Sequence, residues 1–333
     1  MPLATTGHPL HTRTLSVSLT HVEPVTAAFA AYVLDLRKRG FAPVGGDLQG
    51  PGVIHHMRLD GTIDRAAGTI GRIGAQMPAV AFEASPATGG ESCRDLAERV
   101  DHLAGRALDD GYARVVGAEI GGARGCSHIL TLARLLGPTT NWALAEDERL
   151  HGAALARRSG ERIFRRDITV DGYEPAPGEI ALTLQLNDLH FAPAPALAAP
   201  MQRFGAQREI AAGAAVGMKD LVLRRLTASE RRREGADIAS ATWRSRDELV
   251  APLVGCSLRS GISAAILRHF GAGGADGPLR DALLQLAPTI VQCFAALDIW
   301  AMLPGGGVAA ETGGLPDSCY MWRRDGALAK TRR

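Results

Sequence analysis

The 333-residue chain has few aromatic residues, little excess charge and no long apolar run. Phe, Trp and Tyr make up 5% of it, which leaves few rings for stacking on nucleic-acid bases. The net charge of +2 gives no electrostatic reason to expect a nucleic-acid or membrane partner. No apolar run approaches the roughly 18 residues of a membrane span, and no signal peptide opens the chain. We therefore expect a cytoplasmic protein that acts on a small molecule, with oligomerisation left open.

Several familiar motifs are also missing. The five cysteines are too few for a disulfide framework, so we expect reduced thiols. The chain has no phosphate-binding P-loop and no Gly-x-Ser-x-Gly elbow, and the glycine-rich run 271–277 lacks the spacing of a dinucleotide loop. These absences predict that no nucleotide cofactor is used. High Ala, Gly and Arg with little Lys is typical of a GC-rich bacterial genome.

An internal repeat organises what is present. The segment Leu10–Val17 is echoed by Ile163–Val170, and Leu135–Thr139 is echoed by Leu286–Thr289. We predict a first copy over 8–148, a second over 160–303 and a tail over 304–333 that is poorly ordered. In both copies, segments of strand periodicity precede segments of helix periodicity, which favours an α+β fold. The prediction is two homologous strand-then-helix domains that form a pseudo-two-fold pair.

The copies differ in their histidines and cysteines. Our overlay replaces His11 by Phe164, His55 by Lys219, His56 by Asp220, Cys93 by Trp243, Cys126 by Pro278 and His128 by Arg280. Positions that are scattered along the chain, and that all have His or Cys in the first copy and other residue types in the second, are expected to lie close together in space. We therefore predict one site in the first copy, and treat the second copy as degenerate.

Strand periodicity orients part of this site. His11 and Arg13 share the parity of Leu15, so both should point inward from the first strand. His55 should face the core and His56 the opposite side. His11 and His55 are candidate proton-transfer groups, although a buried histidine with satisfied hydrogen bonds is the alternative for His55. Arg13 is a candidate clamp for a substrate anion, with a structural pairing to a protein carboxylate as its alternative.

The sharpest local signal is the run from Gly125 to His128. A glycine-rich turn that opens a helix places Cys126 and His128 in the first turn, where free N–H groups favour a thiolate or a bound anion. Packing of the thiol in the core is the alternative. The spacing of Cys93 with Leu96, Val100, Leu103 and Ala107 predicts a helix with Cys93 on its buried stripe. Pro138 is expected to interrupt the helix that follows the turn.

A family resemblance covers residues 8–145. His11-Thr12-Arg13, His55-His56-Met57, Cys93 with Gly105, the run Gly121 to Ile129, and Leu136-Gly137-Pro138 together resemble the bacterial domain-of-unknown-function family 2889. His56 stands where the family pattern has Asp, and acidic residues of its strand near 74–80 are missing here. The resemblance implies a family and no reaction.

Two functions follow as expectations. The first is a cofactor-independent enzyme, a lyase, isomerase or hydrolase, that uses acid–base or thiol-assisted chemistry on an anionic or carbonyl-containing metabolite. His11, His55, Cys126 and His128 would be catalytic, while Arg13 and His56 would bind substrate. The alternative is a non-catalytic metal- or ligand-binding protein in which His11, His55, Cys93, Cys126 and His128 hold zinc or iron. Their spacing matches no zinc motif, so a metal is not favoured.

Overall fold

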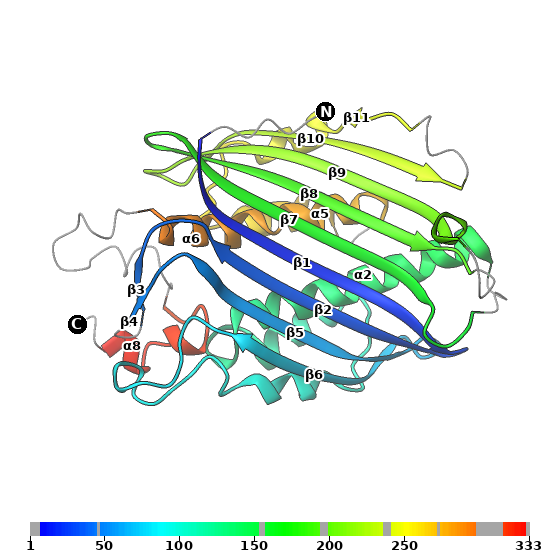
Figure 1. Cartoon of the computed structure of the whole chain (residues 1–333), viewed down its shortest axis with the longest axis horizontal. Helices are drawn as coiled ribbons and strands as arrows, with labels where there is room; N and C mark the ends of the chain where they lie inside the picture. Colours follow the sequence, from blue (N-terminus) through cyan, green and yellow to red (C-terminus); the bar gives the residue numbers. More distant parts are fainter. Residues whose placement is uncertain are drawn as a thin grey trace.

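One large antiparallel sheet dominates the computed structural model (Figure 1). The structure describes residues 7–44, 47–152, 157–193, 199–235, 241–271, 274–297 and 316–330. Within these ranges the sheet has nine strands in the order β11-β10-β9-β8-β7-β1-β2-β5-β6. The presence of helices together with a large antiparallel sheet confirms the mixed helix-and-sheet class that the sequence predicted.

The strands of the two predicted copies meet at the β1–β7 pair. One side holds β1 (His8–Glu23), β2 (Thr26–Arg37), β5 (Gly52–Asp64) and β6 (Thr69–Ala79); the other holds β7 (Arg162–Ala176), β8 (Glu179–Phe191), β9 (Phe204–Gly217), β10 (Leu223–Glu234) and β11 (Arg244–Ser245). A small hairpin, β3 (Ala42–Val44) and β4 (Asp47–Gln49), lies between β2 and β5 in sequence. The two predicted copies therefore share one continuous sheet.

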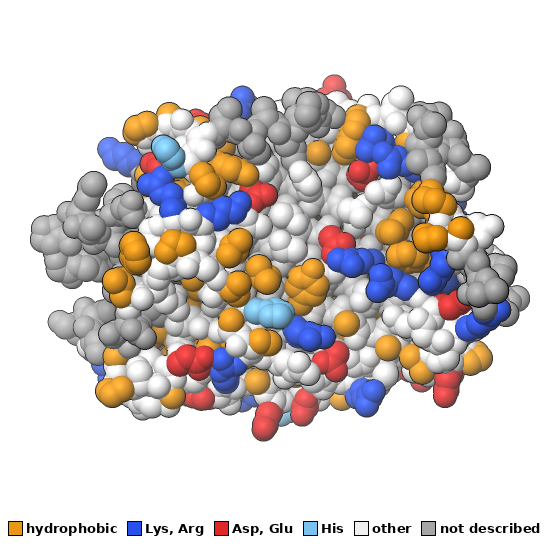
Figure 2. All heavy atoms as spheres, in the orientation of Figure 1, with side chains coloured by type: hydrophobic (Ala, Val, Ile, Leu, Met, Phe, Trp, Pro, Cys, Tyr) orange, Lys and Arg blue, Asp and Glu red, His pale blue; other side chains and the backbone are white. Residues whose placement is uncertain are grey.

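Alternation along the strands separates a helix-covered face from an open one. In β1 the side chains of Leu15, Val17 and Leu19 are fully buried, whereas Ser18 and Thr20 between and after them are half-buried. This is the period-two pattern of a sheet with a core on one side. The helices lie behind the sheet in Figure 1, so the face of the sheet turned to the viewer, drawn with its side chains in Figure 2, is covered by none of the described helices.

The helices follow the strands in each half. They are α1 (Tyr112–Ile120), α2 (Ser127–His151), α3 (Asp247–Val250), α4 (Ile262–Phe270), α5 (Gly277–Leu283), α6 (Leu286–Ala295) and α8 (Ala327–Lys330). Short 3-10 helices are η1 (Pro86–Thr88), η2 (Ala97–Leu103), η3 (Gly122–Arg124), η4 (Pro200–Arg203), η5 (Ala251–Leu253), η6 (Gly274–Asp276) and η9 (Tyr320–Trp322). None of the described helices is both long and apolar enough to cross a membrane.

The expected helix around Cys93 is wrong. Cys93 lies in a turn that leads to η2, and its N–H donates to the carbonyl of Phe82 at 3.1 Å. The Ser92 hydroxyl accepts from the N–H of Arg94, and Asp95 accepts from the N–H of Ser92 at 2.9 Å. Such side-chain hydrogen bonds compete with those of a helix, so the apolar spacing alone did not decide the local structure.

The expected break at Pro138 is also wrong. Helix α2 runs without interruption through Pro138 and reaches His151, beyond the predicted end of the first copy at residue 148. The helix contacts β5, β2, β1 and β7 in turn, so tertiary packing holds it together where one backbone hydrogen bond is lost.

Part of the predicted tail is ordered against the first half. The N–H of Tyr320 donates to the carbonyl of Gly125 at 2.9 Å, and the ring of Trp322 packs edge-on against Phe82 at 5.4 Å. The prediction of a poorly ordered tail is therefore wrong for residues 316–330. Residues 304–315 and 331–333 of the predicted tail lie outside the described part of the chain.

Candidate functional site

A buried carboxylate lies at the centre of the first half. Asp35, on β2, is fully buried and accepts from Arg13 Nη1 at 2.9 Å on Oδ2 and 3.1 Å on Oδ1. His11 Nε2 lies 2.9 Å from Oδ1. The strand register explains the arrangement, because Arg13 on β1 is directly opposite Asp35. The expected inward orientation of His11 and Arg13 is confirmed.

Two further imidazoles reach the same carboxylate. His55 Nδ1 lies 3.3 Å from Asp35 Oδ2, and His128 Nε2 lies 3.1 Å from it. The His55 and His128 rings are stacked with centroids 3.9 Å apart and a 32° tilt. The three histidines that sequence reasoning placed in one site therefore converge on one residue.

A bulge in β5 sets the direction of His55. The partner of Asp35 is His55, while the partner of Leu36 is Val53, so Ile54 is the extra residue. As a result His55 and Met57 are buried, whereas Val53, which shares their parity, is half exposed. The bulge keeps the imidazole on the covered face beside Asp35.

Cys126 lies next to His128 at the start of α2. It is the residue before the helix, and its Sγ is 3.9 Å from His128 Nδ1 and 3.5 Å from Met57 Sδ. The turn depends on Gly125, because a Cβ there would overlap the carbonyl of Ile120. The local sequence thus places a thiol, an imidazole and a carboxylate in one chain of contacts.

Burial sets the protonation states at this site. Burial alone would raise the pKa of Asp35, but the Arg13 guanidinium and the donors His11 and His128 hold it well below its usual range. Burial lowers the pKa of His128 to about 3, with repulsion from His55 adding to it, and burial also lowers the pKa of His11. At neutral pH the site holds an ionised carboxylate, a guanidinium and neutral imidazoles at positions 11 and 128.

The expected thiolate character of Cys126 is wrong for this state of the protein. Burial raises its pKa to about 11, although the N–H groups of Ile129 and His128 lower it. Removal of the thiol from water outweighs the helix end, which contributes roughly 1 kcal/mol. Burial raises the pKa of Cys93 as well.

Two predicted residues stay outside the cluster. The His56 ring lies across the strand from His55 and meets Tyr32 edge-on, with centroids 6.4 Å apart. Cys93 packs in its turn against the core and makes no described contact with Asp35.

Arg13 makes the pairing with a protein carboxylate that was its structural alternative. Its Nε has no hydrogen-bond partner among the described residues, so a clamp function for Arg13 stays a prediction.

Asp35 is the residue that sequence reasoning missed. The stretch from Tyr32 to Leu36 is apolar on both faces of β2, so no alternation marks Asp35 as inward-facing. The only signal is a single acidic residue within that apolar stretch. Because a buried guanidinium is costly without a counter-charge, an inward-facing Arg13 on the neighbouring strand predicts an acidic partner nearby.

The second half contains a corresponding row of charges. Arg166 on β7 lies opposite Asp188 on β8, which in turn lies opposite Arg208 on β9. The first half has the same arrangement, with Arg13 opposite Asp35 and Asp35 opposite His55. Both arginine–aspartate pairs have the same 22-residue separation. By register, His55 therefore corresponds to Arg208. Our overlay of His55 on Lys219 is wrong, because Lys219 and Asp220 lie in the turn between β9 and β10.

The helix residues that reach this second row also differ from the overlay. Asp281 Oδ2 accepts from Arg166 Nη1 at 2.7 Å, much as His128 approaches Asp35. Arg280, which the overlay set against His128, pairs with Asp281 instead. The second half contains a buried charged centre made of carboxylates and guanidiniums, whereas the first half also uses imidazoles.

The first site also offers ligands for a metal. One ligand atom each from Asp35, His55 and His128 lie within 4.8 Å of one another. Two imidazoles and a carboxylate are suitable donors for zinc or iron. However, Arg13 already contacts both oxygens of Asp35, and a cation would have to displace or share that contact.

Comparison with known proteins places this site in a family segment. Residues 11–141 match the model of a protein of unknown function, DUF2889. The DUF2889 segment contains the Asp35 carboxylate and every side chain found around it, and ends within α2. No curated protein and no solved structure matches the chain. The expected resemblance is thus confirmed over the first half.

Proposed function

We propose that the Asp35 site catalyses proton transfer on a small anionic or carbonyl-containing metabolite without a nucleotide cofactor. The observation that supports this most strongly is the contact chain from Asp35 through His128 to Cys126, with distances of 3.1 Å and 3.9 Å. A carboxylate that orients an imidazole beside a thiol is the usual arrangement for activating a nucleophile or moving a proton.

An anionic substrate would change the protonation of the site. Arg13 is balanced by Asp35, and His11 and His128 are neutral in the free protein, so a buried anion would be compensated by a proton taken up on an imidazole. A negative group near His128 would raise the pKa of this imidazole from about 3 and make it a better proton acceptor. The proposed base therefore becomes effective when the substrate arrives. Cys126, protonated in the free protein, would give its proton to Nδ1 of His128, and the thiolate so formed would take the proton from the substrate carbon.

We further propose that the two halves are homologous and related by a pseudo-two-fold axis at the β1–β7 seam. The mirrored strand order on the two sides of the seam and the matching Arg–Asp rows support this proposal. In such a pair, the second half would hold the sheet and α2 in place for the first.

The second candidate function is metal binding without catalysis. It rests on the 4.8 Å grouping of Asp35, His55 and His128. The Arg13 contact opposes it, because a divalent cation beside a buried guanidinium adds like charge in a region of low dielectric.

Deuterium exchange tests proton transfer without knowledge of the product. Pools of carboxylic and keto acids are incubated with the protein in D2O, and incorporation of deuterium at carbon is followed by NMR. We expect incorporation with the wild type and a loss of about a hundredfold or more in His128→Gln. The control is His102→Gln, an exposed histidine on η2.

Metal analysis separates the two candidates. If the purified protein holds one zinc or iron per chain, and Asp35→Ala releases it while no metabolite exchanges deuterium, the metal-binding function replaces the catalytic one. Equal exchange by His128→Gln and wild type would also overturn the catalytic proposal.

A further inference from the structure

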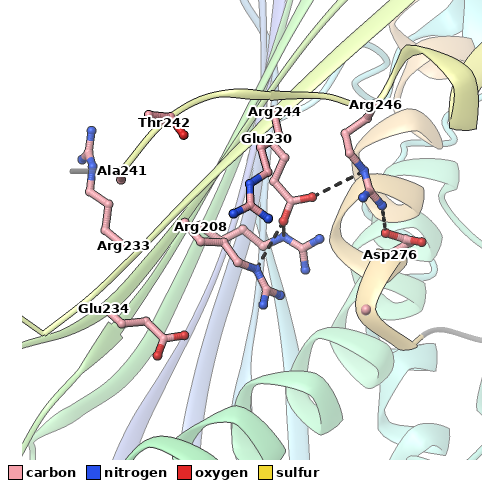
Figure 3. A pocket seen from close by; sticks show the side chains of 11 residues that line it. Arg208, Glu230, Arg233, Glu234, Ala241, Thr242, Arg244, Arg246 and Asp276 are labelled. Carbon is pink, nitrogen blue, oxygen red and sulfur yellow. Dashed lines mark hydrogen bonds and ion pairs between the residues drawn. The ribbon is translucent and has the colours of Figure 1, made fainter. Parts of the chain in front are cut away.

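A cavity of about 530 Å³ lies in the second half, away from the Asp35 site (Figure 3). It is bounded by β9, by the strands β10 and β11, and by η6 before α5. Its volume is within the range of about 300–1,000 Å³ that is typical of small-molecule sites. Its described lining is strongly polar, with five arginines and three acidic residues.

Arg208 brings a buried cation to this cavity. Its side chain is 5% exposed, and Nη1 has no hydrogen-bond partner among the described residues. The residue follows Asp188 in the cross-strand row, which fixes its position on the covered face of β9. A buried guanidinium with an unused donor is costly, and an oxyanion is the group that would satisfy it.

The carboxylates near the cavity do not balance its arginines. Glu230 alone forms ion pairs with three of them, at 2.8 Å from Arg208, 3.2 Å from Arg232 and 3.7 Å from Arg246. Figure 3 shows Glu230 between the Arg208 and Arg246 side chains, with Asp276 on the far side of Arg246.

The remaining charges point the same way. Glu234 is engaged by Arg149 on α2 at 2.7 Å. Arg244 is exposed on β11 and makes no ion pair with any described residue. Arg233 is engaged by Glu209, outside the lining, at 3.2 Å, so four of the five lining arginines remain against Glu230 and Asp276 and the cavity keeps a surplus of positive charge.

A second polar group lies behind Arg208. A small adjoining cavity of about 10 Å³ is lined by His190, Trp142 and Arg208, which is room for about one water molecule. His190 is 2% exposed, and neither ring nitrogen has a partner among the described residues. It is thus another unsatisfied buried group at the inner end of the same region.

We propose that this cavity binds a small polyanion, a compound with two or more phosphate or carboxylate groups. Arginines recognise both groups through paired hydrogen bonds, and several converge here. No aromatic ring lines the larger cavity in the described part of the chain, so a nucleobase would find no stacking surface. The site is independent of the proposed catalytic function, because it uses none of the residues around Asp35.

Calorimetric titration of the full chain with pyrophosphate and, separately, with tricarballylate tests the proposal and identifies the preferred anion group. We expect micromolar binding of at least one of them at low ionic strength. Arg244→Ala should weaken it about tenfold or more, because a hydrogen bond to a charged group is lost. Arg208→Met should abolish it, and Arg244→Ala keeps the test valid if Arg208→Met does not fold.

The matched control is Arg225→Ala, an exposed arginine on β10 that does not line the cavity. It should bind as the wild type does. The proposal is overturned if neither anion binds, or if Arg225→Ala loses as much affinity as Arg244→Ala.

Discussion

Asp35 holds a buried guanidinium in place, which makes its charge important for stability. In Asp35→Asn the Arg13 side chain, 2% exposed, would stay buried without a counter-charge. Breaking one partner of a buried ion pair typically costs about 3–5 kcal/mol, so we expect the free energy of unfolding to fall by about that amount. Urea denaturation followed by circular dichroism measures it.

A surface pair supplies the control for this substitution. Glu83 contacts Arg94 at 2.6 Å with a side chain that is 60% exposed, so Glu83→Gln should cost less than about 1 kcal/mol. A loss in Asp35→Asn as small as that in Glu83→Gln would show that the carboxylate is not structurally required.

The lowered pKa of His128 has a definite effect on stability. The unfolded chain binds a proton at this residue below about pH 6.5, whereas the folded state stays neutral to about pH 3. The folded state therefore binds fewer protons in this window, and the free energy of unfolding falls as the pH falls, by up to about 1.4 kcal/mol per pH unit. His11, whose pKa is also lowered by burial, adds to the same trend.

Imidazole NMR and urea midpoints at a series of pH values check this expectation. The His128 ring signal should not titrate between about pH 5 and 7, and His128→Gln should show a shallower fall of stability with acid. A His128 midpoint near 6.5 would contradict the burial argument.

Sequence reasoning found the histidines and missed their anchor, for a physical reason. His11, His55 and His128 stand out because the second half has other residues there, whereas Asp35 has a counterpart, Asp188, and so shows no contrast. The overlay failed at Lys219 because β9 is rich in Ala and Gly, which gives little alternation to fix its register.

At the scale of elements, α2 packs closely against α1 where it bears a glycine. A Cβ at Gly137 would overlap the buried ring of Tyr112. Alanine is better than glycine in a helix by about 1 kcal/mol, yet we expect Gly137→Ala to lower the free energy of unfolding by about 1–3 kcal/mol through overpacking. Thermal and urea unfolding measure the net sign.

Gly117 on α1 is the matched control. A Cβ there meets only the end of the flexible Arg134 side chain, at 3.0 Å. Gly117→Ala should therefore be neutral or stabilising by up to about 1 kcal/mol. If Gly137→Ala stabilises as much as Gly117→Ala, the helices are less closely packed than described.

The elements that the sequence predicted well are those that local periodicity determines. The alternation that predicted inward-facing His11 and Arg13 in β1 matches the structure. The errors at Cys93 and Pro138 come from contacts that no local pattern contains, namely hydrogen bonds from Ser92 and Asp95 and the packing of α2 across four strands.

At the scale of the whole molecule, the β1–β7 pair makes the halves depend on each other. The pairing extends from His8 opposite Glu174 to Thr20 opposite Arg162. Fragment 1–152 alone would expose β1 as a long edge strand and lose the packed segment 316–330, so we expect it to aggregate. Co-expression with fragment 157–333 should restore a soluble complex, as measured by size-exclusion chromatography. A soluble monomeric 1–152 that unfolds cooperatively would contradict this expectation.

Helix α2 also links the two polar regions mechanically. Its first turn holds His128 beside Asp35, its middle places Thr139 Oγ1 3.0 Å from Arg166, and its last turns hold Arg149 against Glu234. At 1.5 Å per residue α2 is roughly 37 Å long. As long as the helix stays straight, one end cannot shift without the other. Pro138 has no backbone N–H, so one helical hydrogen bond is absent midway along α2, and we expect any bending of the helix to occur there. The two ends of α2 can therefore move separately only if the helix bends at the turn around Pro138.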